Sequence, residues 1–264
     1  MNTYAGKLAV VTGGGSGMGR ELVRQLAARG CSVATCDWRD LPEWHEAPIT
    51  NHRCDVSDEA QVRRFRDEVL AAHASDHVDF FFNNAGIGGG GSFVTGSREE
   101  WERTFAVDWW GVYHCTRAFL PPLIASGDGV LVNTSSVNGF WASLGPGHPN
   151  TAYSTAKFAV KGFTEALVED LRVHAPQLRV VLVLPGHVGT DIVGNSLRFH
   201  GLGELAEIND AFRESAPVSA AQAATIILDG IAAGAWRILV GEDAALIDAH
   251  VRAKPDAAYD WLCL

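Results

Sequence analysis

The sequence has few cysteines, and their spacing indicates neither a disulfide framework nor a metal site. The five are Cys31, Cys36, Cys54, Cys115 and Cys263, and no two of them form a CxxC pair. An odd number of cysteines without such a framework is typical of reduced thiols in a cytoplasmic protein. We therefore expect a cytoplasmic chain whose cysteines bind no metal.

Long apolar runs are also missing, and basic residues are in the minority. No apolar run approaches the roughly 18 residues that a membrane-spanning helix needs. The N-terminal residues lead directly into an apolar segment and lack the features of a signal peptide. Acidic residues outnumber basic ones by 31 to 21, for a net charge of -10. This balance disfavours nucleic acid or an anionic membrane as the main partner.

What the sequence does contain is a regular alternation of apolar strands and amphipathic helices. We expect strands at 7–12, 32–36, 52–55, 78–83, 130–134, 179–184 and 237–240. Helices are expected at 17–29, from an N-cap at Ser57, and at 99–126, 151–175 and 219–233. Strands that are apolar throughout and alternate with helices indicate a parallel sheet covered on both faces.

The alternation predicts a Rossmann-type α/β fold, a doubly wound parallel sheet of about seven strands with helices on both faces. A length of 264 residues suits one domain that spans the whole chain. The stretch 186–215 shows no strand pattern. We interpret about 187–215 as an insertion that binds substrate.

A glycine-rich segment, Thr12 to Gly19, lies between the first strand and the first helix. Glycines there allow a tight turn and let the backbone approach a pyrophosphate, while the helix N-terminus offers unpaired N–H groups. A polar surface turn would have a similar composition. Its position in the first strand–helix unit favours a dinucleotide site.

Asp37 follows the second strand about 20 residues beyond the glycines, where an acidic residue can bind the ribose hydroxyls. Its carboxylate would repel a 2′-phosphate, and Ser16 supplies no compensating cation. We therefore predict NAD as the cofactor, with NADP less favoured. Arg39 argues against this prediction, since a nearby arginine can hold the 2′-phosphate of NADP. The alternative interpretation of Asp37 is a solvated residue at a strand end.

Five motifs occur in order at the expected ends of strands. They are TGxxxGxG at Thr12–Gly19, NNAG at Asn83–Gly86, Ser135-Ser136, YxxxK at Tyr153–Lys157 and PGxxxT at Pro185–Thr190. With these motifs the chain resembles the short-chain dehydrogenase/reductase family, in its compact single-domain branch, over nearly its whole length. The resemblance implies a seven-stranded sheet, a nicotinamide cofactor and a homotetramer or homodimer.

The resemblance also assigns residues to the site. The cofactor contacts are expected at Gly13, Ser16, Gly17, Met18, Asp37, Asp55, Val56, Asn84, Ala85, Gly86, Tyr153, Lys157, Val188 and Thr190. The catalytic residues are expected to be Ser136, Tyr153, Lys157 and Asp108.

Tyr153 and Lys157 lie four residues apart on a predicted helix, so their side chains can share one face. A phenol titrates near pH ~10, and a neighbouring ammonium together with the positive nicotinamide ring favours the phenolate. We therefore expect a lowered pKa for Tyr153, which would exchange a proton with the alcohol oxygen while Ser136 holds that oxygen. The alternative is an ordinary helix with a packing tyrosine and an exposed lysine.

The chain departs from the family pattern at two places. The interval from Ser136 to Tyr153 is a few residues longer than usual, so Ser135 could be the hydroxyl that faces the substrate. Asp108 stands where the family usually has an asparagine that positions a water beside the lysine, and it adds a charge near Lys157.

These observations predict hydride transfer between a nicotinamide cofactor and a secondary alcohol or ketone. A non-catalytic nucleotide sensor on the same fold would be expected to lack Tyr153 or Lys157. A nucleotide-sugar epimerase or dehydratase needs a larger C-terminal region than the about 24 residues that follow Val240.

We expect a mostly apolar, medium-sized small-molecule substrate beneath a mobile lid within 187–215. Apolar side chains follow the reacting residues, namely Phe140, Trp141, Leu144, Ile192, Val193, Leu197, Phe199 and Leu202. Arg198, His187 or His200 could instead anchor an acidic substrate, and the apolar residues could simply pack the lid onto the sheet.

Overall fold

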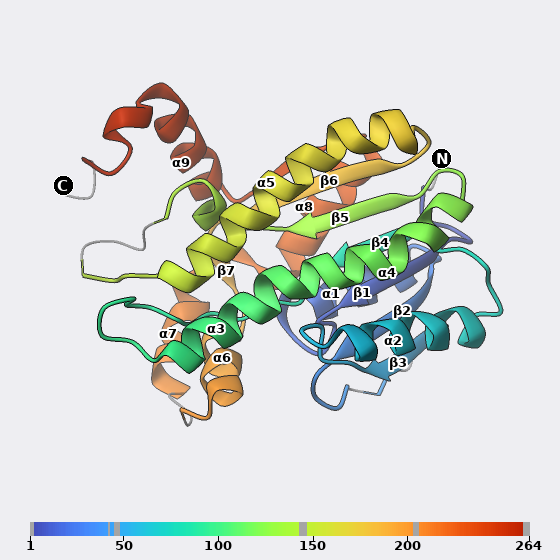
Figure 1. Cartoon of the computed structure of the whole chain (residues 1–264), viewed down its shortest axis with the longest axis horizontal. Helices are drawn as coiled ribbons and strands as arrows, with labels where there is room; N and C mark the ends of the chain where they lie inside the picture. Colours follow the sequence, from blue (N-terminus) through green and yellow to red (C-terminus); the bar gives the residue numbers. More distant parts are fainter. Residues whose placement is uncertain (1–2, 42, 45–47, 143–146, 203–205, 261–264) are drawn as a thin grey trace.

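A seven-stranded parallel sheet forms the centre of the computed structural model, which describes residues 3–41, 43–44, 48–142, 147–202 and 206–260 (Figure 1). The strand order is β3-β2-β1-β4-β5-β6-β9. The strands are β1 (Leu8–Thr12), β2 (Ser32–Asp37), β3 (Ile49–Arg53), β4 (Phe80–Asn83), β5 (Val130–Thr134), β6 (Arg179–Pro185) and β9 (Arg237–Val240). The predicted Rossmann-type, doubly wound fold is confirmed.

Helices cover both faces of this sheet (Figure 1). The α-helices in the described part of the chain are α1 (Gly17–Ala28), α2 (Glu59–Ala72), α3 (Arg98–Phe105), α4 (Gly111–Ala125), α5 (Thr151–His174), α6 (Ile192–His200), α7 (Ala206–Glu214), α8 (Ala220–Ala232) and α9 (Glu242–Ala253). Helices α1 and α8 pack on one face, and α2, α4 and α5 pack on the other.

The central strands are apolar throughout because each has one row of side chains in each of two cores. In β1, Ala9 and Val11 belong to the core beneath α1 and α8, whereas Leu8 and Val10 belong to the opposite core. All five residues of β1 are buried. Burial on both faces is the usual condition of a parallel sheet in an α/β protein.

The order of the strands reverses between β1 and β4, and this reversal positions the site. From β1 the chain proceeds to β2 and β3 on one side, then returns to β4, β5 and β6 on the other. In open α/β sheets a crevice forms at such a point, outside the carboxyl ends of the strands. The loops after β1, β2, β4, β5 and β6 all emerge at that edge.

The predicted N-cap of α2 was wrong, and the helical stretch expected at 99–126 contains a turn that was not predicted. The N-cap of α2 is Asp58, whose Oδ1 accepts hydrogen bonds from the N–H groups of Ala60 and Gln61, whereas Ser57 donates to Asp55. The helix expected at 99–126 is interrupted by a π-helical turn at Ala106–Trp110, which separates α3 from α4. The π turn is only five residues long, and the apolar residues on either side of it were interpreted as one helix.

The stretch 186–215 does contain a strand, contrary to expectation. Residues Val188–Gly189 form β7, which pairs in parallel with β8 at Val218–Ser219 in a separate two-stranded sheet. A two-residue strand is too short to show an alternating pattern. The pair fixes both ends of the segment that carries α6 and α7.

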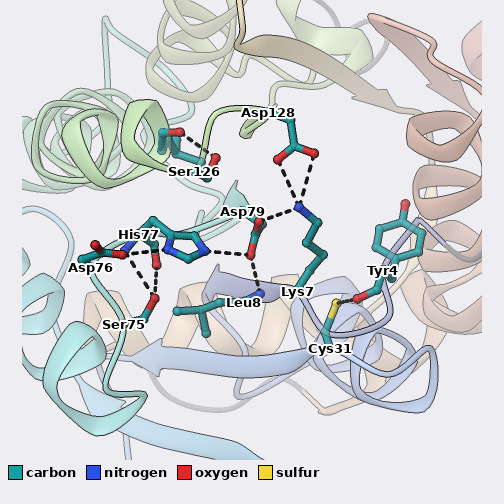
Figure 2. Close-up of polar contacts among 11 residues, drawn as sticks. Tyr4, Lys7, Leu8, Cys31, Ser75, Asp76, His77, Asp79, Ser126 and Asp128 are labelled. Atoms are coloured by element: carbon teal, nitrogen blue, oxygen red, sulfur yellow. Dashed lines mark hydrogen bonds and ion pairs between the residues drawn. The ribbon is translucent and has the colours of Figure 1, made fainter.

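A polar cluster holds the sheet together at its amino edge, away from the crevice (Figure 2). The Nζ of Lys7 lies 2.9 Å from Oδ1 of Asp79 and 3.1 Å from Oδ1 of Asp128. Oδ2 of Asp79 accepts the N–H of Leu8 at 2.7 Å. Asp79 therefore connects the starts of β1 and β4, with its side chain only 5% exposed.

We predict that Asp79→Ala lowers the free energy of unfolding by roughly 2–3 kcal/mol, since it leaves the buried N–H of Leu8 without its acceptor. The matched control is Asp128→Ala, whose side chain is 66% exposed and whose ion pair should contribute about 1 kcal/mol or less. Urea unfolding of both variants measures the difference. Equal losses in the two variants would contradict this account.

Candidate active site

A cleft at the carboxyl edge of the sheet runs across the reversal between β1 and β4. Its lining comes from the loops after β1, β2, β3, β4 and β6 and from α6. The lining residues are Gly13, Ser16, Gly17, Met18, Gly19, Asp37, Trp38, Arg39, Cys54, Asp55, Val56, Asn84, Ala85, Gly86, Ile87, Val107, Thr190, Asp191, Ile192, Asn195 and Phe199.

The glycine loop approaches the loop after β4 too closely for a side chain at Gly13. Gly13 has φ +71°, and a Cβ there would lie 2.8 Å from the Cα of Ala85. Helix α1 begins at Gly17, and its N-cap, Ser16, makes no side-chain capping bond. The N–H groups of this helix end are therefore oriented toward the cleft, as a phosphate site requires.

Asp37 is held at one end of the cleft by backbone and side-chain donors. Its Oδ2 accepts the N–H of Gly15 at 3.1 Å, and its Oδ1 accepts the N–H and Nε of Arg39 at 3.2 and 3.3 Å. Nη1 of Arg39 donates to Oδ1 of Asn195 at 2.8 Å, and Nδ2 of Asn195 donates to Oγ of Ser16 at 2.9 Å. Helix α6 is thus connected to both the glycine loop and the strand end.

Most of the expected cofactor residues line this cleft, and three do not. Tyr153 and Lys157 lie beside it on α5, whereas Val188 is buried within β7. Asn84 lines the cleft and also fixes the start of the glycine loop, because its Nδ2 donates to the carbonyl of Thr12 at 3.0 Å.

Tyr153 and Lys157 lie in the first two turns of α5, on one face as predicted. The Nζ of Lys157 lies 5.3 Å from the centroid of the Tyr153 ring. It is 3.3 Å from Oδ1 of Asp108 and donates to the carbonyl of Thr134 at 3.3 Å. Only 4% of the Lys157 side chain is exposed, so the ammonium is a buried charge.

The structure separates the two serines that follow β5. The hydroxyl of Ser135 donates to the backbone carbonyl of Lys157 at 2.7 Å. Ser136 instead accepts the N–H of Asn138 and hydrogen-bonds Tyr153, which favours the phenolate and so lowers the pKa of the phenol. Ser135 therefore supports the helix backbone, and Ser136 lies beside the phenol.

The pKa of Tyr153 is raised, not lowered as the sequence led us to expect. Burial disfavours the phenolate and is the largest influence on this pKa. Lys157 lowers the pKa, but Asp108 raises it and works against the ammonium. The expectation of a lowered pKa rested on the lysine and on the positive nicotinamide ring, and it left out the low-polarity surroundings of the phenol.

Several side chains that we expected around the substrate have other partners. Nε1 of Trp141 donates to the carbonyl of Ala258 at 3.3 Å, and Phe199 packs edge-on against Trp38 in the cleft. Leu144 lies outside the described residues. Two of the side chains that could have anchored an acidic substrate also have backbone partners. Nε2 of His187 contacts the carbonyl of Phe212 at 2.8 Å. Nε2 of His200 contacts the carbonyl of Gly88 at 3.2 Å.

Sequence reasoning missed Asn195 and Trp38, which both line the cleft. Trp38 could have been found, since it adjoins Asp37 at the strand end. Asn195 belongs to no motif, and only the position of α6 brings it to the glycine loop. Among the described residues, no cluster of three or more histidine, cysteine or acidic side chains could hold a metal ion. No described helix is long and apolar enough to cross a membrane.

A seven-stranded parallel sheet with a glycine-loop cleft and an adjacent tyrosine–lysine pair defines a dinucleotide-binding oxidoreductase. Comparison with known proteins agrees with this class. The model of the short-chain dehydrogenase family matches residues 7–200. The chain therefore belongs to the short-chain dehydrogenase/reductase family, whose fold binds a nicotinamide cofactor.

Individual relatives span most of the chain. SadH of Mycobacterium tuberculosis, an oxidoreductase by name, is 37% identical over 96% of this chain and 92% of its own length. Meso-2,3-butanediol dehydrogenase of Serratia marcescens is 32% identical over 80% of each chain. A short-chain dehydrogenase from Burkholderia phymatum, solved with NAD, is 29% identical, with a TM-score of 0.82 over 97% of this chain and 95% of that one.

Proposed function

We propose that this protein is an NAD-dependent oxidoreductase that interconverts a secondary alcohol and its ketone. The observation that carries the proposal is the position of Tyr153, Lys157 and Ser136 together beside the dinucleotide cleft. A non-catalytic sensor would have no need of a buried ammonium 5.3 Å from a phenol ring.

The cleft fits a dinucleotide by its backbone as well as by its side chains. A Cβ at Gly19 would lie 2.1 Å from the carbonyl of Gly13, and one at Gly15 would lie 2.7 Å from Oδ2 of Asp37. Glycines at these positions let the loop fold tightly on itself and against Asp37, so that its backbone lines the cleft. We propose that α1 and Ser16 hold the phosphates, Asp37 holds the adenosine ribose, and Asp55 and Val56 lie against the adenine.

At the reacting end, this chain supplies proton transfer and charge stabilisation, and the bound nicotinamide supplies or accepts the hydride. The hydroxyl of Ser136 holds the substrate oxygen as charge develops there. Oη of Tyr153 accepts the alcohol proton in oxidation and returns it in reduction. The ammonium of Lys157 stabilises the phenolate and binds the nicotinamide ribose.

Tyr153→Phe should lower kcat by at least about two orders of magnitude, because general acid–base catalysis contributes roughly 10²–10⁴-fold. NADH should still bind, as its fluorescence would report. The matched control is Ser154→Ala on the same helix, since the buried Ser154 hydroxyl has no hydrogen-bond partner among the described residues. A Tyr153→Phe enzyme with more than about a tenth of wild-type activity would refute this mechanism.

NAD should be preferred to NADP, because the Asp37 carboxylate faces the ribose position and would repel a 2′-phosphate. The guanidinium of Arg39 donates hydrogen bonds to Asp37 and Asn195, so it is not directed at an open phosphate site. We expect kcat/KM to be at least about tenfold higher with NAD, equivalent to ~1.4 kcal/mol. Equal or higher values with NADP would show that Arg39 leaves these partners to bind the phosphate.

We propose a mostly apolar, medium-sized substrate that lies beneath α6. Ile192, Val193 and Leu197 on this helix are partly exposed beside Thr190. Such side chains contribute roughly 25 cal/mol per Å² of apolar ligand surface that they bury. His187 and His200, which could have anchored an acidic substrate, are engaged by backbone carbonyls.

The segment 187–215 should close over the bound ligands. Asn195 and Phe199 of α6 already line the cofactor cleft, so a bound cofactor changes the contacts of this helix. Hydrogen exchange should slow across the segment when NADH and a substrate analogue are added, and α8 provides the internal control. Unchanged exchange would argue against a lid, and a kinetic preference for carboxylated or phosphorylated substrates would contradict the apolar assignment.

We also propose a homodimer or homotetramer. Trp110 and Phe158 are large apolar side chains that are 44% and 42% exposed. They lie at the π turn before α4 and on α5, and a second copy of the chain would cover them. The mass of the particle in solution tests this proposal.

A further inference from the structure

Asp108 is a buried carboxylate that the proposed reaction does not require. It lies in the π-helical turn between α3 and α4 and is fully buried. Its Oδ1 is 3.3 Å from Nζ of Lys157 and accepts the N–H of Ile87 at 3.2 Å. Its Oδ2 has no hydrogen-bond partner among the described residues. π turns commonly occur at functional sites, where they redirect side chains.

On the basis of the proposed function, we propose that Asp108 sets the pH at which Tyr153 exchanges its proton, by partly neutralising the ammonium of Lys157. Asp108 contacts Lys157, so it acts through the lysine as a positioning residue. A neutral asparagine at this position, which is usual in the family pattern, would leave the positive charge of Lys157 without a compensating negative charge.

Because both charges are buried, Asp108 strongly reduces the influence of the Lys157 ammonium on Tyr153. The side chains of Lys157 and Asp108 are 4% and 0% exposed, so solvent screens their charges little. An ammonium paired with a carboxylate presents a dipole to the phenol, and a dipole stabilises a phenolate less than a full charge does. Lys157 and Asp108 are the charged groups that act on Tyr153, and Ser136 adds a hydrogen bond.

The neighbouring backbone lies close to this ion pair. A Cβ at Gly86 would lie 2.6 Å from Oδ1 of Asp108 and 3.2 Å from Nζ of Lys157. On the far side, the carbonyl of Thr134 accepts a hydrogen bond from the same Nζ. The carboxylate and the ammonium are therefore confined between the ends of β4 and β5, and the charge pair is a fixed part of the site.

The direction of the pH dependence follows from the protonation state of Tyr153 that each reaction direction requires. Alcohol oxidation requires the phenolate, so kcat/KM for oxidation rises with pH up to the apparent pKa of Tyr153. Ketone reduction requires the phenol, so its kcat/KM falls above that same pKa. The Asp108 carboxylate raises this pKa. Burial raises the pKa of Asp108 itself to about 6, despite Lys157. Below about pH 6, therefore, the carboxylate is protonated and its influence fades.

The test compares wild type with Asp108→Asn in both reaction directions. The rising limb for oxidation should move at least about one pH unit toward acid, and oxidation at pH 7 should become about tenfold faster. The rates of the two enzymes should converge below about pH 6. Superimposable profiles over the whole pH range would overturn the proposal.

A second readout requires neither cofactor nor turnover. The chain has four tyrosines, so the ultraviolet difference between each protein and its Tyr153→Phe partner isolates the ionisation of Tyr153. The midpoint should be lower in Asp108→Asn than in wild type and higher in Lys157→Met. An equal midpoint in wild type and Asp108→Asn would overturn the proposal.

A second neutral variant and two distinguishable outcomes separate the role of Asp108 from the proposed function. Removing one member of a buried ion pair can destabilise the protein, so Asp108→Ser provides a smaller neutral variant if Asp108→Asn does not fold. A spectroscopic shift without turnover on any substrate would support the role of Asp108 and count against the proposed function. Turnover with unshifted profiles and midpoints would retain the function and refute the role of Asp108.

Discussion

The ammonium of Lys157 lies in the interior of the protein, and the surrounding structure accommodates this buried charge. Transfer of an ammonium out of water is costly unless partners replace its hydration. Asp108 and the carbonyl of Thr134 are those partners, and they come from the π turn and from the end of β5. The strand order that brings these elements together also creates the cleft, so the fold and the charged site depend on each other.

The parts of the site that the sequence predicted have a local cause. Glycines at Gly13 and Gly17 are required by positive φ angles and close contacts, so they occur in a recognisable motif. Tyr153 and Lys157 share a helix, so their spacing alone places them together. The central strands β1, β4 and β5 were predictable because burial on both faces requires uniformly apolar segments. The edge strand β3 is partly exposed and polar, and it lies at Ile49–Arg53 and not at the expected 52–55.

The parts that the sequence did not predict depend on contacts between distant segments. Asn195 meets Ser16 across 179 positions, and no pattern around either residue anticipates that bond. The π turn and the β7–β8 pair are each too short to show a pattern of their own. The direction of the Tyr153 pKa shift was missed because it reflects burial and the carboxylate of Asp108, which the helix pattern does not contain.

The central claim is that this chain transfers a hydride between a secondary alcohol and a nicotinamide in the cleft beside Tyr153. The most direct test is to incubate the wild-type protein and NAD with secondary alcohols deuterated at the carbinol carbon, including apolar, medium-sized ones. The account predicts that deuterium reaches one face of the nicotinamide C4 and that the matching ketone forms in equal amount. Bound NAD that acquires no deuterium from any of these alcohols would contradict it.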